Sequence, residues 1–132
     1  MRRPARLAKS SRNRAPATSD ELAPVFDAVA DYFGLLAEPT RLAILHTICN
    51  DEKTVSAIVE ATGATQTNVS RHLGLMLHAG VVSRRRDGSN VYYRVANPEF
   101  VEICRSVCVQ IAGRIDEQKP LRKDLLSFAS GH

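Results

Sequence analysis

Apolar residues recur along most of the chain at spacings of three and four, which is the period of an amphipathic helix. The pattern predicts helices over residues 20–37, from the break at 38–40 to about 49, over 55–62, over 65–79 and from 98 to about 118. Thr54 and Thr65 have side chains suited to capping the third and fourth of these helices. Gly63 and Gly80 suit the left-handed position after their last turns. Each predicted helix has one apolar face, so we expect the helices to pack around a shared core.

Between Gly80 and Asn97 the pattern becomes strand-like. The runs VVSRRR and VYYRV are β-prone and are joined by DGSN at positions 87–90. Asp-Gly between two such runs is a strong hairpin signal. Asn97 suits the N-cap of the last helix, with Pro98 at its first position. The sequence therefore predicts a mainly α protein with one small β-hairpin between the fourth and fifth helices.

The third and fourth predicted helices are joined by the four residues ATGA, the spacing of a helix-turn-helix. The second helix of this motif enters the major groove of DNA, and its first turns meet the bases. Val69, Leu73 and Met76 would face the core. The outward polar side chains at the leading end are Gln66, Thr67, Asn68, Ser70 and Arg71. These residue types bind bases and phosphates, although an ordinary amphipathic surface helix can carry similar side chains.

The predicted hairpin is rich in arginine. Arg84, Arg85, Arg86 and Arg94 lie there against a single acid, Asp87. Consecutive arginines can form a solvated edge that resists aggregation. Directly after a helix-turn-helix they are better interpreted as a wing that grips phosphates. The expected DNA contacts of the hairpin are Arg84, Arg86 and Arg94.

The stretches EPTRLAIL, QTNVSRHLGLMLHAGVV and RRRDGSNVYYRV together resemble the ArsR/SmtB family of bacterial winged-helix repressors, over roughly residues 22–115. The resemblance implies a winged helix-turn-helix that binds palindromic operator DNA as a homodimer and leaves it when a small inducer binds. It adds His72 to the recognition-helix motif, where the residue would contact DNA or pack locally. The family often has a basic residue where Leu77 stands, so one phosphate contact is lost.

A homodimer is also expected from the apolar stripes of the first and fifth predicted helices. A body this small has little left over to cover both stripes. Pairing across a two-fold axis would bury them, and a two-fold dimer matches a palindromic site.

Three cysteines, Cys49, Cys104 and Cys108, are the candidate inducer-sensing residues. Cys104 and Cys108 are four apart and share one helix face. Free cysteines are often simply small buried hydrophobes. The resemblance to sulfide- and persulfide-sensing members implies instead a disulfide or polysulfide bridge between Cys49 and Cys108 or Cys104. A further alternative is that all three thiolates bind arsenite or another soft metal ion.

The usual metal sites of the resembled family are not expected in this chain. Residues 54–63 contain no Cys-x-Cys, and residues 98–118 contain no paired Asp/His set. The sequence also lacks a Gly-rich phosphate loop, a Cys-x-x-Cys motif and a nucleophile elbow, so we expect neither an enzyme nor a cofactor. The alternative without specific DNA binding is a small thiol-transfer protein that uses the Cys-x-x-x-Cys helix.

Composition and charge set the remaining limits. No apolar run is long enough to cross a bilayer, and an odd cysteine count gives no disulfide framework, so we expect a cytoplasmic protein without a membrane partner. The net charge of +4 comes from residues 1–17, which hold six Lys/Arg and no acid. We therefore expect a disordered basic tail over 1–19, a DNA-binding and dimerisation domain over 20–118, and a C-terminal tail over 119–132. The basic tail could instead add phosphate contacts, or be a transit peptide.

Overall fold

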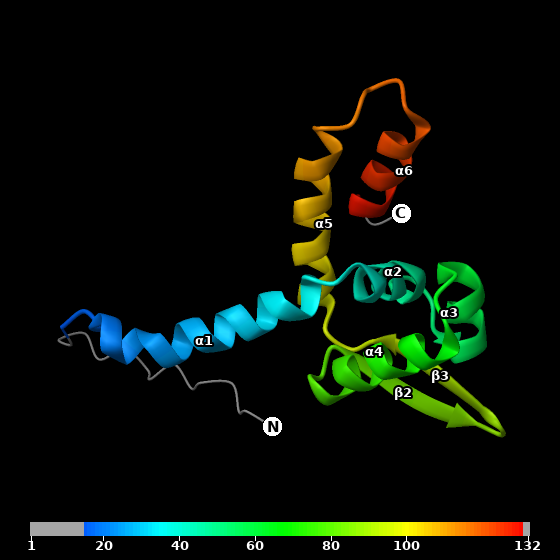
Figure 1. Ribbon diagram of the computed structural model, residues 1–132, viewed down its shortest axis with the longest axis horizontal. Helices are drawn as coiled ribbons and strands as arrows, with labels where there is room; N and C mark the ends of the chain where they lie inside the picture. Colours follow the sequence, from blue (N-terminus) through cyan, green and yellow to red (C-terminus); the bar gives the residue numbers. More distant parts are fainter. Residues whose placement is uncertain (1–14, 131–132) are drawn as a thin grey trace. The chain divides into compact units, whose positions relative to one another are not determined.

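The computed structural model describes residues 15–130, which fall into two compact units that meet between residues 38 and 39 (Figure 1). Most of the basic tail predicted from the sequence therefore lies outside the described residues. The first unit contains the helix α1 (Ser19–Leu36). Thr18 and Glu21 form a reciprocal capping box at its start, each side chain accepting the backbone N–H of the other.

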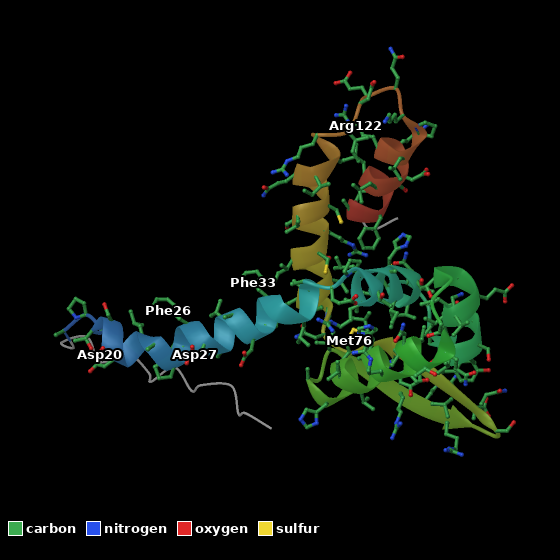
Figure 2. All side chains as sticks on the ribbon, in the orientation of Figure 1. Asp20, Phe26, Asp27, Phe33, Met76 and Arg122 are labelled. Carbon is green, nitrogen blue, oxygen red and sulfur yellow. The ribbon has the colours of Figure 1, made fainter. Side chains whose placement is uncertain are left out.

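Helix α1 buries none of its residues. Phe26 is 60% exposed and Phe33 is 53% exposed. Figure 2 shows these two rings on one side of the helix, with Asp20 and Asp27 on the other. The helix is therefore amphipathic, as its periodicity predicts, and its apolar face is exposed within the described residues of its own unit.

The second unit is mainly helical with a small antiparallel sheet, which confirms the predicted fold class. Its elements are α2 (Pro39–Ile48), β1 (Lys53–Thr54), α3 (Val55–Thr62), α4 (Gln66–His78), β2 (Val82–Asp87), β3 (Asn90–Val95), α5 (Pro98–Ala112) and α6 (Pro120–Ala129). Residues from α2, α3, α4, the start of β2 and α5 supply the core. Its largest fully buried side chains include Phe100, Ile44, Leu45, Ile48, Ile58, Leu73 and Met76. None of the helices among the described residues could span a membrane.

The caps predicted for the helix-turn-helix are confirmed. Thr54 accepts the N–H of Ala57 at the start of α3, and Thr65 accepts the N–H of Asn68 at the start of α4. Gly63 ends α3 with φ +72°, a conformation that costs glycine little. These local signals fix the turn, and the turn sets the angle at which α4 leaves α3.

The end of α4 is closed by a Schellman motif. Gly80, with φ +79°, donates to the carbonyl of Leu77, and Val81 donates to the carbonyl of Met76. Val81 and Met76, the two positions between which this motif commonly has an apolar contact, are both buried. The cap leads the chain directly from α4 into the hairpin.

The sheet has the strand order β1-β3-β2, with antiparallel neighbours. Asp87 pairs with Asn90 across a two-residue turn in which Gly88 has φ +63°. The hairpin extends away from the helices (Figure 1). Strand β1 was not predicted, because two residues are too few to show an alternating pattern. That strand pairs with β3 and ties the hairpin to the α2–α3 connection.

The C-terminal part differs from the prediction. Helix α5 ends at Ala112 with Gly113 as its C-cap, rather than at about residue 118. The segment treated as a tail contains α6, which lies alongside α5 (Figure 1). The Phe128 ring of α6 lies 4.7 Å, centroid to centroid, from the His46 ring of α2. Its centroid is 5.7 Å from the guanidinium carbon of Arg105 in α5. Helix α6 therefore contacts both α2 and α5.

Candidate nucleic-acid interface

The leading end of α4 carries an exposed polar surface over a buried apolar side. The side chains of Val69, Leu73 and Met76 are fully buried. The exposed polar residues at this end of α4 are Gln66, Thr67, Asn68, Ser70 and Arg71. Thr67, Ser70 and Arg71 lie on the side of the helix opposite the buried residues, and Gln66 and Asn68 are exposed in its first turn. We call these five residues the recognition surface.

Gly74 lies on the exposed side of α4, one turn after Ser70. A Cβ added there would meet nothing within 4 Å in the described part of the chain. A glycine inside a helix costs roughly 1 kcal/mol relative to alanine. Packing against another helix of the same chain does not account for it. The missing side chain leaves room for another molecule to approach the backbone of α4.

His72 is buried and lies outside the recognition surface, so of its two expected roles, DNA contact and local packing, its placement favours local packing. Its side chain is only 3% exposed. Its Nδ1 lies 3.3 Å from Nη1 of Arg41, and its Nε2 lies 3.4 Å from Nη2 of Arg71. The imidazole of His72 therefore lies between the guanidinium groups of Arg41 in α2 and Arg71, and when neutral it can accept a hydrogen bond from only one of them at a time.

The sheet register divides the hairpin arginines between two faces. Successive residues of a strand point to opposite faces. Arg84 and Arg86 share one face, and Arg85 shares the other with Arg94, which pairs with Ser83. The Nε of Arg94 donates to Oγ of Ser83 at 3.2 Å. The structure therefore brings together Arg84 and Arg86 of the predicted wing contacts, but not Arg94.

Arg85 is bound to a partner that the sequence analysis did not find. Its Nε lies 2.8 Å from Oε2 of Glu52 and 3.0 Å from Oε1, and its Nη2 also donates to Oε1. Its guanidinium carbon lies 4.6 Å from the centroid of the Tyr92 ring. The hydrogen bonds from Arg85 lower the pKa of Glu52, and those to Glu52 raise the pKa of Arg85. Both groups are therefore charged at neutral pH.

An open hollow of about 460 Å³ lies at the base of the hairpin, and Cys49, Glu52, Arg85 and Arg94 are among the residues that line it. The thiol of Cys49 donates to the carbonyl of His46 at 3.1 Å. Cys49 therefore lies beside the wing.

The other two cysteines lie on α5, and burial raises the pKa of both. Cys104 is 7% exposed, and its burial, with a smaller effect of nearby Cys108, raises its pKa to about 11. Burial also raises the pKa of Cys108, which is half-buried. Residues 15–130 contain no group of three Cys, His, Asp or Glu side chains arranged to hold a metal. The structure thus does not gather the three thiols within one chain.

The helix-turn-helix, the outward polar end of α4 and the arginine-bearing hairpin together define a winged-helix DNA-binding protein. Comparisons with known proteins agree with this class. Residues 38–84 match the family described as bacterial regulatory protein, arsR family. A probable mercury resistance operon repressor of Streptomyces lividans is 38% identical over 93 residues, which are 68% of this chain and 74% of that relative.

Two solved structures extend the match. The crystal structure of Rv0081 from Mycobacterium tuberculosis has a TM-score of 0.61 at 32% identity, covering 69% of this chain and 91% of the other. The second is the homodimeric winged helix-turn-helix domain of Mb0332 from Mycobacterium bovis, a possible ArsR-family regulator. It has a TM-score of 0.65 at 31% identity, and the match covers 80% of this chain and 97% of the other. The chain belongs to the ArsR family. It is a transcriptional repressor with a DNA-binding winged helix-turn-helix, and not an enzyme.

Proposed function

We propose that this chain represses transcription in the cytoplasm as a homodimer bound to a palindromic operator. The five residues of the recognition surface would enter the major groove, and Arg84 and Arg86 would contact phosphates beside it. The observation that carries this proposal is the exposed polar leading end of α4 above a fully buried apolar side. Arg94 lies on the other face of the hairpin, so it would support the hairpin and would not contact the phosphates that Arg84 and Arg86 bind.

The proposed dimer is supported by large apolar side chains that are exposed on each of the two units in the described part of the chain. Phe26, Val29 and Phe33 of α1 are exposed, as are Val107 and Ile111 of α5. The similar domain from Mycobacterium bovis is homodimeric. A two-fold pairing of these surfaces would place two copies of α4 on one face of DNA, at half-sites related by the same axis.

Replacing Phe33 with glutamate is expected to weaken dimerisation and, with it, operator binding. The change puts a charge into an apolar surface, and in a two-fold interface each protomer carries the same defect. We expect the dimer dissociation constant to rise about 100-fold or more. Sedimentation equilibrium of the free protein measures it. Gly34→Glu adds the same charge at the next position, outside the apolar stripe, and should leave the constant near the wild-type value. Equal effects of the two changes would contradict the proposed interface.

We propose that the inducer acts on the thiols of Cys104 and Cys108. Cβ atoms four residues apart on a helix are about 5–6 Å apart, whereas disulfide-bonded Cβ atoms are about 3.5–4.5 Å apart. A direct disulfide would therefore distort α5, and a bridge with an inserted sulfur atom fits better. This spacing favours reactive sulfur species over a simple oxidant.

The proposed chemistry balances with hydrogen disulfide as the oxidant. Each cysteine thiol takes one sulfur atom from a molecule of hydrogen disulfide, which forms a persulfide and releases hydrogen sulfide. The two persulfides then condense to a trisulfide and release a third hydrogen sulfide. The cysteine sulfurs are oxidised as sulfane sulfur is reduced to sulfide, and an added dithiol reverses the bridge.

A bridge from Cys49 to Cys104 or Cys108 stays a prediction from the sequence. Cys49 lies beside the hairpin, so the bridge requires either movement of α2 relative to α5 or a thiol from the second protomer. Mass spectrometry of protease digests distinguishes a Cys49 bridge from a bridge within α5, because only the Cys49 bridge links two peptides that are distant in the sequence. An intact Cys49 peptide after treatment would assign the switch to α5.

A soft metal ion is the second candidate inducer. The relative from Streptomyces lividans is named a probable mercury resistance operon repressor. Two thiolates one helical turn apart suit a soft ion, and binding would displace both thiol protons. Arsenite prefers three thiolates, so it would require Cys49 or a partner thiol in addition to Cys104 and Cys108.

Release would follow because the modified dimer prefers a geometry that no longer fits the operator. Two connections would carry a movement of α5, caused by modification of its cysteines, to the DNA-binding elements. Helix α5 starts directly after β3, with Asn97 as its cap, so a shift of α5 would move the wing. Phe128 of α6 contacts both Arg105 of α5 and His46 of α2, so a shift of α5 would also reach α2, which packs against both helices of the helix-turn-helix.

A further inference from the structure

We propose that Glu52 is a positioning residue for DNA binding, because it braces the wing through Arg85. The inference rests on the proposed operator binding, since it concerns the residues that hold the DNA-contacting hairpin in place. Glu52 lies immediately before β1, outside both α4 and the hairpin.

The brace runs across all three strands of the sheet. Arg85 of β2 pairs with Tyr92 of β3, and Tyr92 pairs with Thr54 of β1. The Arg85 side chain lies over the Tyr92 ring and reaches Glu52 with two donor nitrogens. A forked arginine–carboxylate contact is geometrically specific and stronger than a single ion pair. It therefore connects the outer strand of the wing to the connection between α2 and α3.

The same arrangement removes Arg85 from the set of phosphate contacts. Its guanidinium is committed to Glu52 and Tyr92, on the opposite face from Arg84 and Arg86. The run of three arginines thus has two roles. All three arginines are exposed, but only Arg84 and Arg86 are available to DNA, whereas Arg85 is bound to Glu52 and fixes the angle at which they are presented.

Because Glu52 is negatively charged, the direction in which operator affinity changes when it is replaced tests the proposal. Removing an acid near a DNA-binding surface ordinarily raises affinity, because it reduces repulsion from phosphate. Removing the brace should instead lower affinity, because the wing must then be ordered when DNA binds. Asp51 supplies a matched control, since it is adjacent, carries the same charge and pairs with Lys53 at 3.4 Å rather than with the wing.

The experiment measures operator affinity of the full chain by fluorescence anisotropy over a range of salt concentrations. Glu52→Gln is expected to lower affinity about threefold to tenfold with an unchanged salt slope, since no phosphate contact is removed. Asp51→Asn is expected to leave affinity unchanged or slightly raised. Glu52→Gln that binds as tightly as the wild type, or more tightly, overturns the brace.

A second pair of variants tests Arg85 directly. Arg84→Gln should reduce the salt slope by about one, as loss of a phosphate contact does. Arg85→Gln should lower affinity and keep the wild-type slope. A slope reduced by about one in Arg85→Gln would make Arg85 a phosphate contact and overturn the brace. If Arg71→Ala also left operator affinity intact, the proposed function itself would fail, and this outcome is distinct from failure of the brace.

Discussion

Replacing Arg71 with alanine is expected to lower operator affinity by about 10- to 100-fold, the range for loss of one specific base contact. Arg71 is exposed in the second turn of α4, and its guanidinium Nη2 lies 3.4 Å from the imidazole Nε2 of the buried His72. The side chain is therefore both directed outward and restrained. The thermal unfolding midpoint should change little, because an exposed side chain contributes little to the core.

Arg114→Ala is the matched control for this variant. Arg114 is exposed and follows the end of α5, so its loss changes the net charge equally without touching the recognition surface. If both variants lost the same affinity, the effect would be one of net charge alone. If Arg71→Ala bound the operator as the wild type does, the assignment of α4 as the recognition helix would be wrong.

Replacing Cys104 or Cys108 with serine is expected to abolish release by polysulfide while leaving operator affinity within about twofold of the wild type. Serine retains the size of the residue but cannot form a sulfur bridge. Titration of operator-bound protein with polysulfide measures the response. Cys49→Ser is the comparison variant, and it should still be released if the bridge lies within α5.

The response should also depend on pH in a defined direction. The thiolate is the nucleophile, and burial raises the pKa of Cys104 to about 11, so the thiol is protonated at neutral pH. The initial rate of release should therefore rise about tenfold per pH unit over the range in which the protein stays folded. A rate that is flat between pH 7 and 9 would exclude Cys104 as the first nucleophile. Release that persists in both α5 serine variants would exclude the α5 switch altogether.

The fold was largely predictable because its boundaries are set by local residues. Thr54, Thr65, Gly63 and Gly80 act as the caps that their types and positions indicate. The hairpin turn follows from Asp-Gly in the same way. Helix α6 was missed, because Gly113 ends α5 early and the polar connection that follows hides a second short apolar period.

The candidate site was predictable only in part. The burial of His72 follows from the helical period, since it lies three residues after Val69 and four before Met76, both buried. The division of the arginines follows from strand alternation, which separates Arg85 from its neighbours. The contact between Glu52 and Arg85 could not be predicted, because it depends on the pairing of β1 with β3 between segments far apart in sequence.

The most direct test of the account is fluorescence anisotropy of the reduced wild-type protein on the DNA upstream of its own gene. We expect salt-sensitive binding that is at least about 1,000-fold tighter than to a scrambled duplex. We expect release on adding polysulfide, and rebinding after a dithiol. Equal affinity for the two duplexes would contradict the central claim of a sequence-specific operator-binding repressor. Specific binding that ignores polysulfide but is lost with mercury(II) would keep that claim and make the soft metal ion the inducer.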